Sequence, residues 1–134
     1  MAAPMASTND LTAFVQTTTG DLNWNITGDT ELLAGVASAR YEVSQIQAMH
    51  TDTNDVVADR LMVFLTNDTR FIIKGWVDIK AQAVSTAVGG KPPEPVTFNF
   101  SPPIKLPGTT DKLTVKSAVT QNWEWVITQG RRFS

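Results

Sequence analysis

The residues best suited to acid–base or metal chemistry lie close together in one short segment. His50 is the only histidine, and Asp52, Asp55 and Asp59 follow it in the sequence DTNDVVAD. Clustered carboxylates can bind a hard cation such as Ca²⁺, but the segment lacks the glycine and the glutamate that an EF-hand loop carries at its sixth and twelfth positions. We therefore expect a solvated loop at the three aspartates and a surface or half-buried side chain at His50.

The chain offers few other groups for catalysis. It has no cysteine, which removes disulfides, thiolate metal ligands and cysteine nucleophiles. With one histidine, a zinc site of three or four His, Cys or carboxylate ligands is not expected, and no serine lies in a nucleophile-elbow sequence. The sequence therefore predicts a protein that is not an enzyme and has no metal or other cofactor.

Composition and charge narrow the choice of partners. The chain has 134 residues, of which 42% are hydrophobic and 18% charged, which suits one domain with a buried core. Eleven basic against thirteen acidic residues give a net charge of −2, which argues against a nucleic-acid partner. No apolar run reaches the length of a membrane span, and the first residues lack the features of a signal peptide. We expect neither a nucleic acid nor a membrane as a partner.

Apolar and polar residues alternate along several short segments, which is the pattern of strands with one buried face. The segments are residues 22–26, 61–65, 71–79, 96–100, 113–116 and 123–128, and Gly130 is expected to end the last of them. The second and third are joined by Asn67-Asp68-Thr69, which predicts a β-hairpin.

Two further segments are ambiguous. Residues 31–39 fit a short helix, because Ala and Leu favour helices, or equally a strand and turn, because Gly35 weakens a helix. Residues 41–48 fit a strand only if a bulge lies near Ser44–Gln45.

Glycine and proline mark the connections. Gly89-Gly90 and Pro92-Pro93 predict a long loop over residues 81–95, and Pro102-Pro103 predicts the next connection. About eight strands without a long amphipathic helix predict an all-β, single-domain, jelly-roll-like sandwich of antiparallel strands. Residues 1–10, small and polar, are expected to form a flexible N-terminal arm, and residues 11–134 the sandwich.

Four tryptophans are many for this length, and exposed aromatic rings can stack on sugars or bases. Trp123 and Trp125 alternate onto one face, so they suit either such a platform or the centre of the core. We favour the core for this pair.

Four segments in this order resemble the small jelly-roll decoration proteins, also called cement or auxiliary head proteins, of tailed bacteriophages. DTELLAGVASARYEVSQIQA is similar to the family's Leu-Ala-small-residue segment before a strand, and FIIKGWVDI to its central strand. VTFNFSPPIKLPGTTDKLTVKSA is similar to its apolar strand, Pro-Ile step, Gly turn and Leu-Thr-Val strand, and WEWVITQG to its closing strand.

This resemblance implies a homotrimer of eight-stranded jelly rolls on the outer surface of the virion, made in the bacterial cytoplasm. It implies binding to the major capsid protein at threefold or quasi-threefold points, which would stabilise the assembled shell. The expected capsid contacts, chosen for exposure and flexibility, are Pro4 and Met5 in the arm, Gly89, Gly90, Lys91, Pro92 and Pro93 in the loop, and Arg131, Arg132 and Phe133 at the C-terminal end.

Two other functions remain open on the sequence. A carbohydrate-binding module is one, because jelly rolls also form lectins; it requires two or more tryptophans exposed in a groove. A trimeric receptor-binding or fibre-tip domain is the other.

Overall fold

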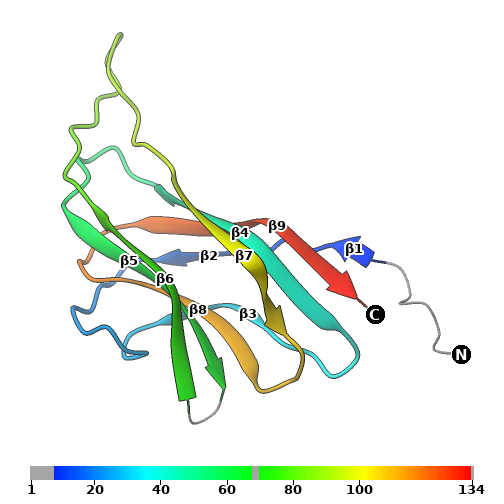
Figure 1. Cartoon of the computed structure of the whole chain (residues 1–134). Coiled ribbons are helices and arrows are strands. Elements are labelled where there is room, and N and C mark those ends of the chain that lie inside the picture. Colours follow the sequence, from blue (N-terminus) through cyan, green and yellow to red (C-terminus); the bar gives the residue numbers. More distant parts are fainter. Residues whose placement is uncertain (1–7, 68–69, 134) are drawn as a thin grey trace, which may run out of the picture.

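The computed structural model describes residues 8–67 and 70–133, and in these residues it contains nine strands and no helix (Figure 1). The strands are β1 (Thr8–Asp10), β2 (Phe14–Thr17), β3 (Thr30–Ala34), β4 (Arg40–His50), β5 (Asp59–Asn67), β6 (Arg70–Ile79), β7 (Val96–Leu106), β8 (Asp111–Ser117) and β9 (Trp123–Phe133).

The first two strands act as one interrupted edge strand. Both pair antiparallel with β9, Thr8 opposite Phe133 and Thr17 opposite Trp123. Between them, the N–H of Leu11 donates to the carbonyl of Gly130 at 3.0 Å. The sandwich therefore has two layers of four strand positions each: the β9 sheet, ordered β1/β2–β9–β4–β7, and the β8 sheet, ordered β3–β8–β5–β6.

Strand pairing is nested from the ends of the chain inward. β1/β2 pairs with β9, β3 with β8, β4 with β7, and β5 with β6, all antiparallel. This order arises when one long hairpin is wound across two sheets, and it defines a jelly roll. The predicted fold class is confirmed.

The two sheets share one hydrophobic core. Its centre includes Trp125 and Ile127 of β9 and Val63 and Val115 of the β8 sheet, each at most 1% exposed. Trp123 is also 1% exposed, so the expectation that Trp123 and Trp125 belong to the core is confirmed. Each buried indole has a partner: Trp125 Nε1 donates to Thr17 Oγ1 and Trp123 Nε1 to Asp59 Oδ2, both at 3.0 Å.

Several local predictions are also confirmed. β5 and β6 form the expected hairpin, and the register of β4 shifts between Val43 and Gln45, where a bulge was expected. The ambiguous segment at residues 31–39 contributes β3 and no helix. Residues 81–95 form no strand, as predicted.

Two strand predictions are wrong in opposite ways. Residues 22–26 form no strand and bend at residues 23–26. Leu22 and Trp24 are 81% and 64% exposed, because this segment crosses the outside of the β8 sheet instead of joining either sheet. Gly130 does not end the last strand, which runs on to Phe133 between β1 and β4.

Two further boundaries also differ from the sequence prediction. Pro102 and Pro103 lie within β7 and not in a connection; β7 is an edge strand, where a residue without an N–H is tolerated. Residues 8–10 of the expected arm are a strand, because β9 extends far enough to pair with them.

Candidate functional site

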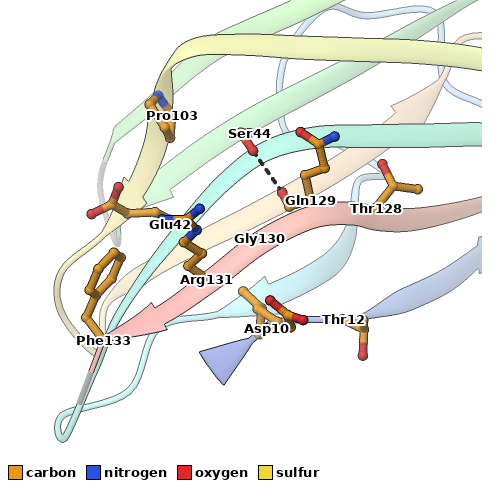
Figure 2. A pocket seen from close by; sticks show the side chains of 11 residues that line it. Asp10, Thr12, Glu42, Ser44, Pro103, Thr128, Gln129, Gly130, Arg131 and Phe133 are labelled. Atoms are coloured by element: carbon orange, nitrogen blue, oxygen red, sulfur yellow. Dashed lines mark hydrogen bonds between the residues drawn. The ribbon is translucent and has the colours of Figure 1, made fainter. Parts of the chain in front are cut away.

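An open hollow of about 510 Å³ lies on the outer face of the β9 sheet, near the C-terminal end of β9 (Figure 2). We call it the end hollow. Eleven residues line it: Asp10, Leu11, Thr12, Glu42, Ser44, Pro103, Thr128, Gln129, Gly130, Arg131 and Phe133.

Strand register places the charged groups of the end hollow in one row. Arg131 of β9 lies opposite Asp10 of β1 on one side and opposite Glu42 of β4 on the other. Glu42 also forms an ion pair with Arg40 at 3.1 Å, and the guanidinium of Arg40 lies 4.7 Å from the centre of the Phe133 ring. The hollow thus combines two carboxylates, the guanidinium of Arg131 and a half-buried aromatic ring, a set suited to binding a polar surface.

The predicted capsid contacts fall into two separate places. Arg131 and Phe133 line the end hollow, and Arg132, between them, is half-buried. The loop with Gly89, Gly90, Lys91, Pro92 and Pro93 lies at the opposite end of the sandwich (Figure 1). Pro4 and Met5 lie outside the described residues.

The register gives the separation of these two places. Arg132 lies opposite Tyr41, whereas Val96, where the loop ends, lies opposite Ala48. Seven residues of β4 span about 23 Å. The loop residues and the C-terminal residues are therefore too far apart to belong to one compact contact surface.

Two aspartates of the DTNDVVAD segment, Asp52 and Asp55, each connect this segment to another loop through a hydrogen bond. Asp55 accepts a hydrogen bond from the N–H of Val84 at 2.9 Å, and Asp52 accepts one from Asn122 Nδ2 at 2.9 Å. Within residues 8–67 and 70–133 no three His, Cys, Asp or Glu side chains are grouped as a metal site.

Asp59 corrects the expectation of a solvated loop. It is 7% exposed, and its Oδ1 accepts hydrogen bonds from the N–H groups of Arg60, Ala118 and Val119 at 2.7, 2.9 and 3.0 Å. Its Oδ2 accepts two more, from Gln121 Nε2 at 2.9 Å and Trp123 Nε1 at 3.0 Å. The carboxylate therefore joins the start of β5 to the turn between β8 and β9.

His50 also differs from its prediction. It is 4% exposed because β4 continues to this residue and places its ring inside, opposite Trp123. The two rings meet edge to face at 5.6 Å between centroids, and His50 Nε2 lies 3.6 Å from Asp52 Oδ1.

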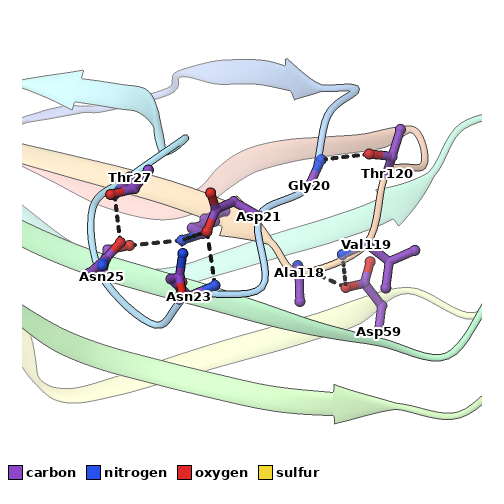
Figure 3. A network of polar contacts seen from close by, with 10 residues as sticks. Gly20, Asp21, Asn23, Asn25, Thr27, Asp59, Ala118, Val119 and Thr120 are labelled. Atoms are coloured by element: carbon purple, nitrogen blue, oxygen red, sulfur yellow. Dashed lines mark hydrogen bonds and ion pairs between the residues drawn. The ribbon is translucent and has the colours of Figure 1, made fainter.

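Residues 20–29, which we call the strap, cross the outside of the β8 sheet and are held by polar contacts (Figure 3). Lys116 of β8 points into the strap with a fully buried side chain and contacts Asp21 Oδ1 at 3.1 Å, the carbonyl of Asn23, and the carbonyl of Asn25 at 3.0 Å. The N–H of Asn23 and the ammonium of Lys116 both lower the pKa of Asp21.

Hydrogen bonds within the strap also hold its conformation. The N–H of Asn23 donates to Asp21 Oδ1 at 2.8 Å and the N–H of Thr27 to Asn25 Oδ1 at 2.9 Å. Gly28 then turns the chain with a φ of +73°, a conformation that favours glycine. Trp24 is therefore carried by a fixed segment.

A second hollow, of about 230 Å³, lies beside the strap and is lined by Trp24, Arg60, Met62, Ile73 and Trp76. We call it the tryptophan groove. Trp24 and Trp76 are 64% and 54% exposed, so the groove has the two exposed tryptophans that a carbohydrate-binding module requires.

The polar side of the groove is an ion pair between adjacent strands. Arg60 Nε and Nη2 lie 2.7 and 3.2 Å from the two carboxylate oxygens of Asp78, and the guanidinium lies 4.5 Å from the centre of the Trp76 ring. This hydrogen bonding lowers the pKa of Asp78 and raises that of Arg60. Sequence reasoning missed Arg60. The available signal was spacing: Arg60 and Met62 lie two residues apart on one face of β5, as Trp76 and Asp78 do on one face of β6.

The described residues include no helix long and apolar enough to cross a membrane.

Comparisons with known proteins do not assign this chain to a family. No protein-family model matches the chain, and the search of curated proteins finds no similar sequence.

Proposed function

We propose that this chain is a decoration protein of a tailed-phage head, which binds the major capsid protein on the outside of the virion and stabilises the assembled shell. The observation that carries the proposal is the pairing of β1 with the end of β9. It puts the first described residues of the chain beside Arg131 and Phe133, at one open hollow. Residues 8–10, the described part of the expected arm, therefore lie at the same end of the sandwich as Arg131 and Phe133.

The chemistry of the end hollow suits such a contact. Asp10, Glu42 and Arg131 offer charges of both signs, and Phe133 offers an aromatic edge. Protein interfaces commonly combine aromatic and Arg anchors with a polar rim. A protein that binds only the assembled shell stabilises that shell by mass action, and many copies act together.

A homotrimer forms part of the proposal, supported by the exposed apolar side chains near the tip of the β5–β6 hairpin. Phe71 and Ile72 are 38% and 56% exposed and line an open hollow of about 560 Å³ with Leu65. β6 is also an edge strand of the β8 sheet. A closed symmetric assembly covers apolar side chains and strand edges of this kind.

The test joins oligomeric state to capsid binding. Light scattering after size exclusion should give about 44 kDa, since one chain has 14.6 kDa, and Ile72→Ser should lower this mass. The protein should co-sediment with heads of its own phage that were assembled without it. Arg131→Glu should abolish co-sedimentation, whereas Lys91→Glu, at the opposite end, should not.

Two results would count against decoration. A monomer that fails to co-sediment with heads contradicts both parts of the proposal. A trimer that binds host cells but not heads indicates a receptor-binding or fibre-tip domain instead.

A further inference from the structure

We infer that the tryptophan groove is a carbohydrate-binding site for one pyranose unit of a neutral glycan. The groove lies on the outer face of the β8 sheet and the end hollow on that of the β9 sheet. The two sites are therefore separate, and each can be tested without the other.

Cross-strand register builds the floor and one wall of the groove. Met62 of β5 lies opposite Trp76 of β6 and opposite Lys116 of β8. Its neighbours Leu61 and Val63 belong to the core, so Met62 points outward, yet it is 0% exposed. Met62 is thus covered by the groups around it and forms an apolar base beneath the groove that a ligand does not reach directly.

The strap supplies the other wall. Because the buried ammonium of Lys116 binds Asp21 and the carbonyls of Asn23 and Asn25, Trp24 is held between two fixed points. A ligand that contacts Trp24 does not have to order this segment first. Preorganisation of this kind lowers the entropic cost of binding.

The groups in the groove match the two sides of a pyranose ring. The guanidinium of Arg60 lies over one face of the Trp76 indole, so the flat, electron-rich surface on which the C–H face of a sugar can stack is the exposed indole of Trp24. A guanidinium has five N–H donors, of which Asp78 uses those on Nε and Nη2. The remaining donors of Arg60, which lines the groove, are available to sugar hydroxyls, while Asp78 holds the guanidinium in place from outside the lining.

Charge and size select the class of glycan. Asp78 neutralises Arg60, so the groove has no uncompensated cation for a phosphate or an acidic sugar. Its volume of about 230 Å³ is below the range of about 300–1,000 Å³ usual for drug-sized ligands. A hollow of this volume with a neutralised Arg60 suits one ring of a neutral glycan.

The experiment is titration calorimetry of the full chain against neutral glycans, such as oligomers of glucose, galactose, mannose and N-acetylglucosamine, with sialyllactose as the acidic comparison. We expect binding of at least one neutral glycan in the millimolar range or tighter. Trp24→Ala and Trp76→Ala should each weaken it at least about tenfold. Phe14→Ala is the matched control, because Phe14 is an aromatic residue 73% exposed on the other sheet.

Three outcomes overturn the inference. They are no binding by any neutral glycan up to about 10 mM, binding that both tryptophan variants retain, and a preference for the acidic glycan. A concentration-dependent mass that Trp24→Ala abolishes, without glycan binding, would assign the groove to a second copy of the chain. Arg131→Glu should leave glycan binding unchanged, which separates this result from the test of capsid binding.

Discussion

The Nζ of Lys116 lies 3.1 Å from Oδ1 of Asp21, where the lysine side chain is fully buried and the aspartate side chain is 26% exposed. A buried ammonium costs free energy unless its three N–H donors find acceptors. Asp21 and the carbonyls of Asn23 and Asn25 provide three. The strap and Lys116 therefore depend on each other: the strap covers the charge, and the charge holds the strap over the β8 sheet.

Replacing Lys116 with methionine, which has a similar length but no donor, should destabilise the fold by about 1–3 kcal/mol, because strap acceptors lose a charged partner. Urea unfolding measures this cost. Lys112→Met is the matched control on the same strand: its side chain is 51% exposed and lies 3.7 Å from Glu31, so its loss should cost less than about 1 kcal/mol. Equal costs for both variants would contradict a pinning role for Lys116.

The same pair predicts a loss of stability in acid. The pKa of Asp21 is lowered from its usual value of 3.8, first by the N–H of Asn23 and then by Lys116. The folded state therefore favours the carboxylate, and this stabilisation is present above pH 3.8 and is lost as the pH falls through the lowered pKa.

Unfolding curves from pH 7 to pH 2 measure this dependence. Asp78, whose pKa is also lowered, contributes in the same window through its hydrogen bond from Arg60. Asp21→Asn should therefore reduce the acid dependence, and adding Asp78→Asn should reduce it further. An unchanged acid limb in the double variant contradicts the prediction.

The buried carboxylate of Asp59 gives a third prediction. Asp59→Asn keeps the shape but replaces one acceptor oxygen by a donor, which then faces either backbone N–H groups or the donors of Gln121 and Trp123. The expected cost is about 2–4 kcal/mol, since a buried donor is left unsatisfied in either orientation.

Denaturant unfolding checks this value, and Asp55→Asn serves as its control. Asp55 is exposed and accepts one backbone hydrogen bond, from Val84, so its cost should stay near 1 kcal/mol or below. If Asp59→Asn lowered the free energy of unfolding no more than Asp55→Asn, the contact between β5 and the β8–β9 turn would not depend on the carboxylate of Asp59.

Period-two alternation was sufficient to predict the sandwich, because each central strand turns one face to a shared core. The same rule failed at residues 22–26, where Leu22, Trp24 and Ile26 alternate as regularly as those in any true strand. What holds these residues outside both sheets is Lys116, more than 90 residues away. Local pattern carries no information about a partner at that distance.

The candidate sites were predictable in part. Arg131 and Phe133 could be chosen because they place charge beside an aromatic ring, and both line the end hollow. Arg60 was missed, because alternation shows which face of β5 it lies on but does not give the register that places it opposite Asp78. The expectation of a solvated loop at Asp59 is wrong for the same reason. The five hydrogen-bond donors to its carboxylate come from β5 itself and from residues 118–123, which only the folded chain brings together.

The last prediction concerns the close approach of two chain segments at Gly35. Its N–H donates to the carbonyl of Asp111 at 2.8 Å, and a Cβ at this position would lie 1.9 Å from the carbonyl oxygen of Gly108. Because the obstructing atom is backbone, the segment after β3 or the turn before β8 must move to admit even one methyl group. Gly35→Ala should therefore cost about 1–3 kcal/mol in urea unfolding.

Gly108→Ala tests the same contact from its other side. A Cβ on Gly108 would meet only Asp111 Oδ2, at 3.5 Å, an ordinary van der Waals distance. The two substitutions add the same methyl group to two facing segments, so the difference between them isolates the steric contact from the general effect of replacing glycine. Gly108→Ala should change stability by no more than about 0.5 kcal/mol. Equal effects at both positions would show that the turn before β8 moves freely, and that Gly35 is not required for β3 to pair with β8.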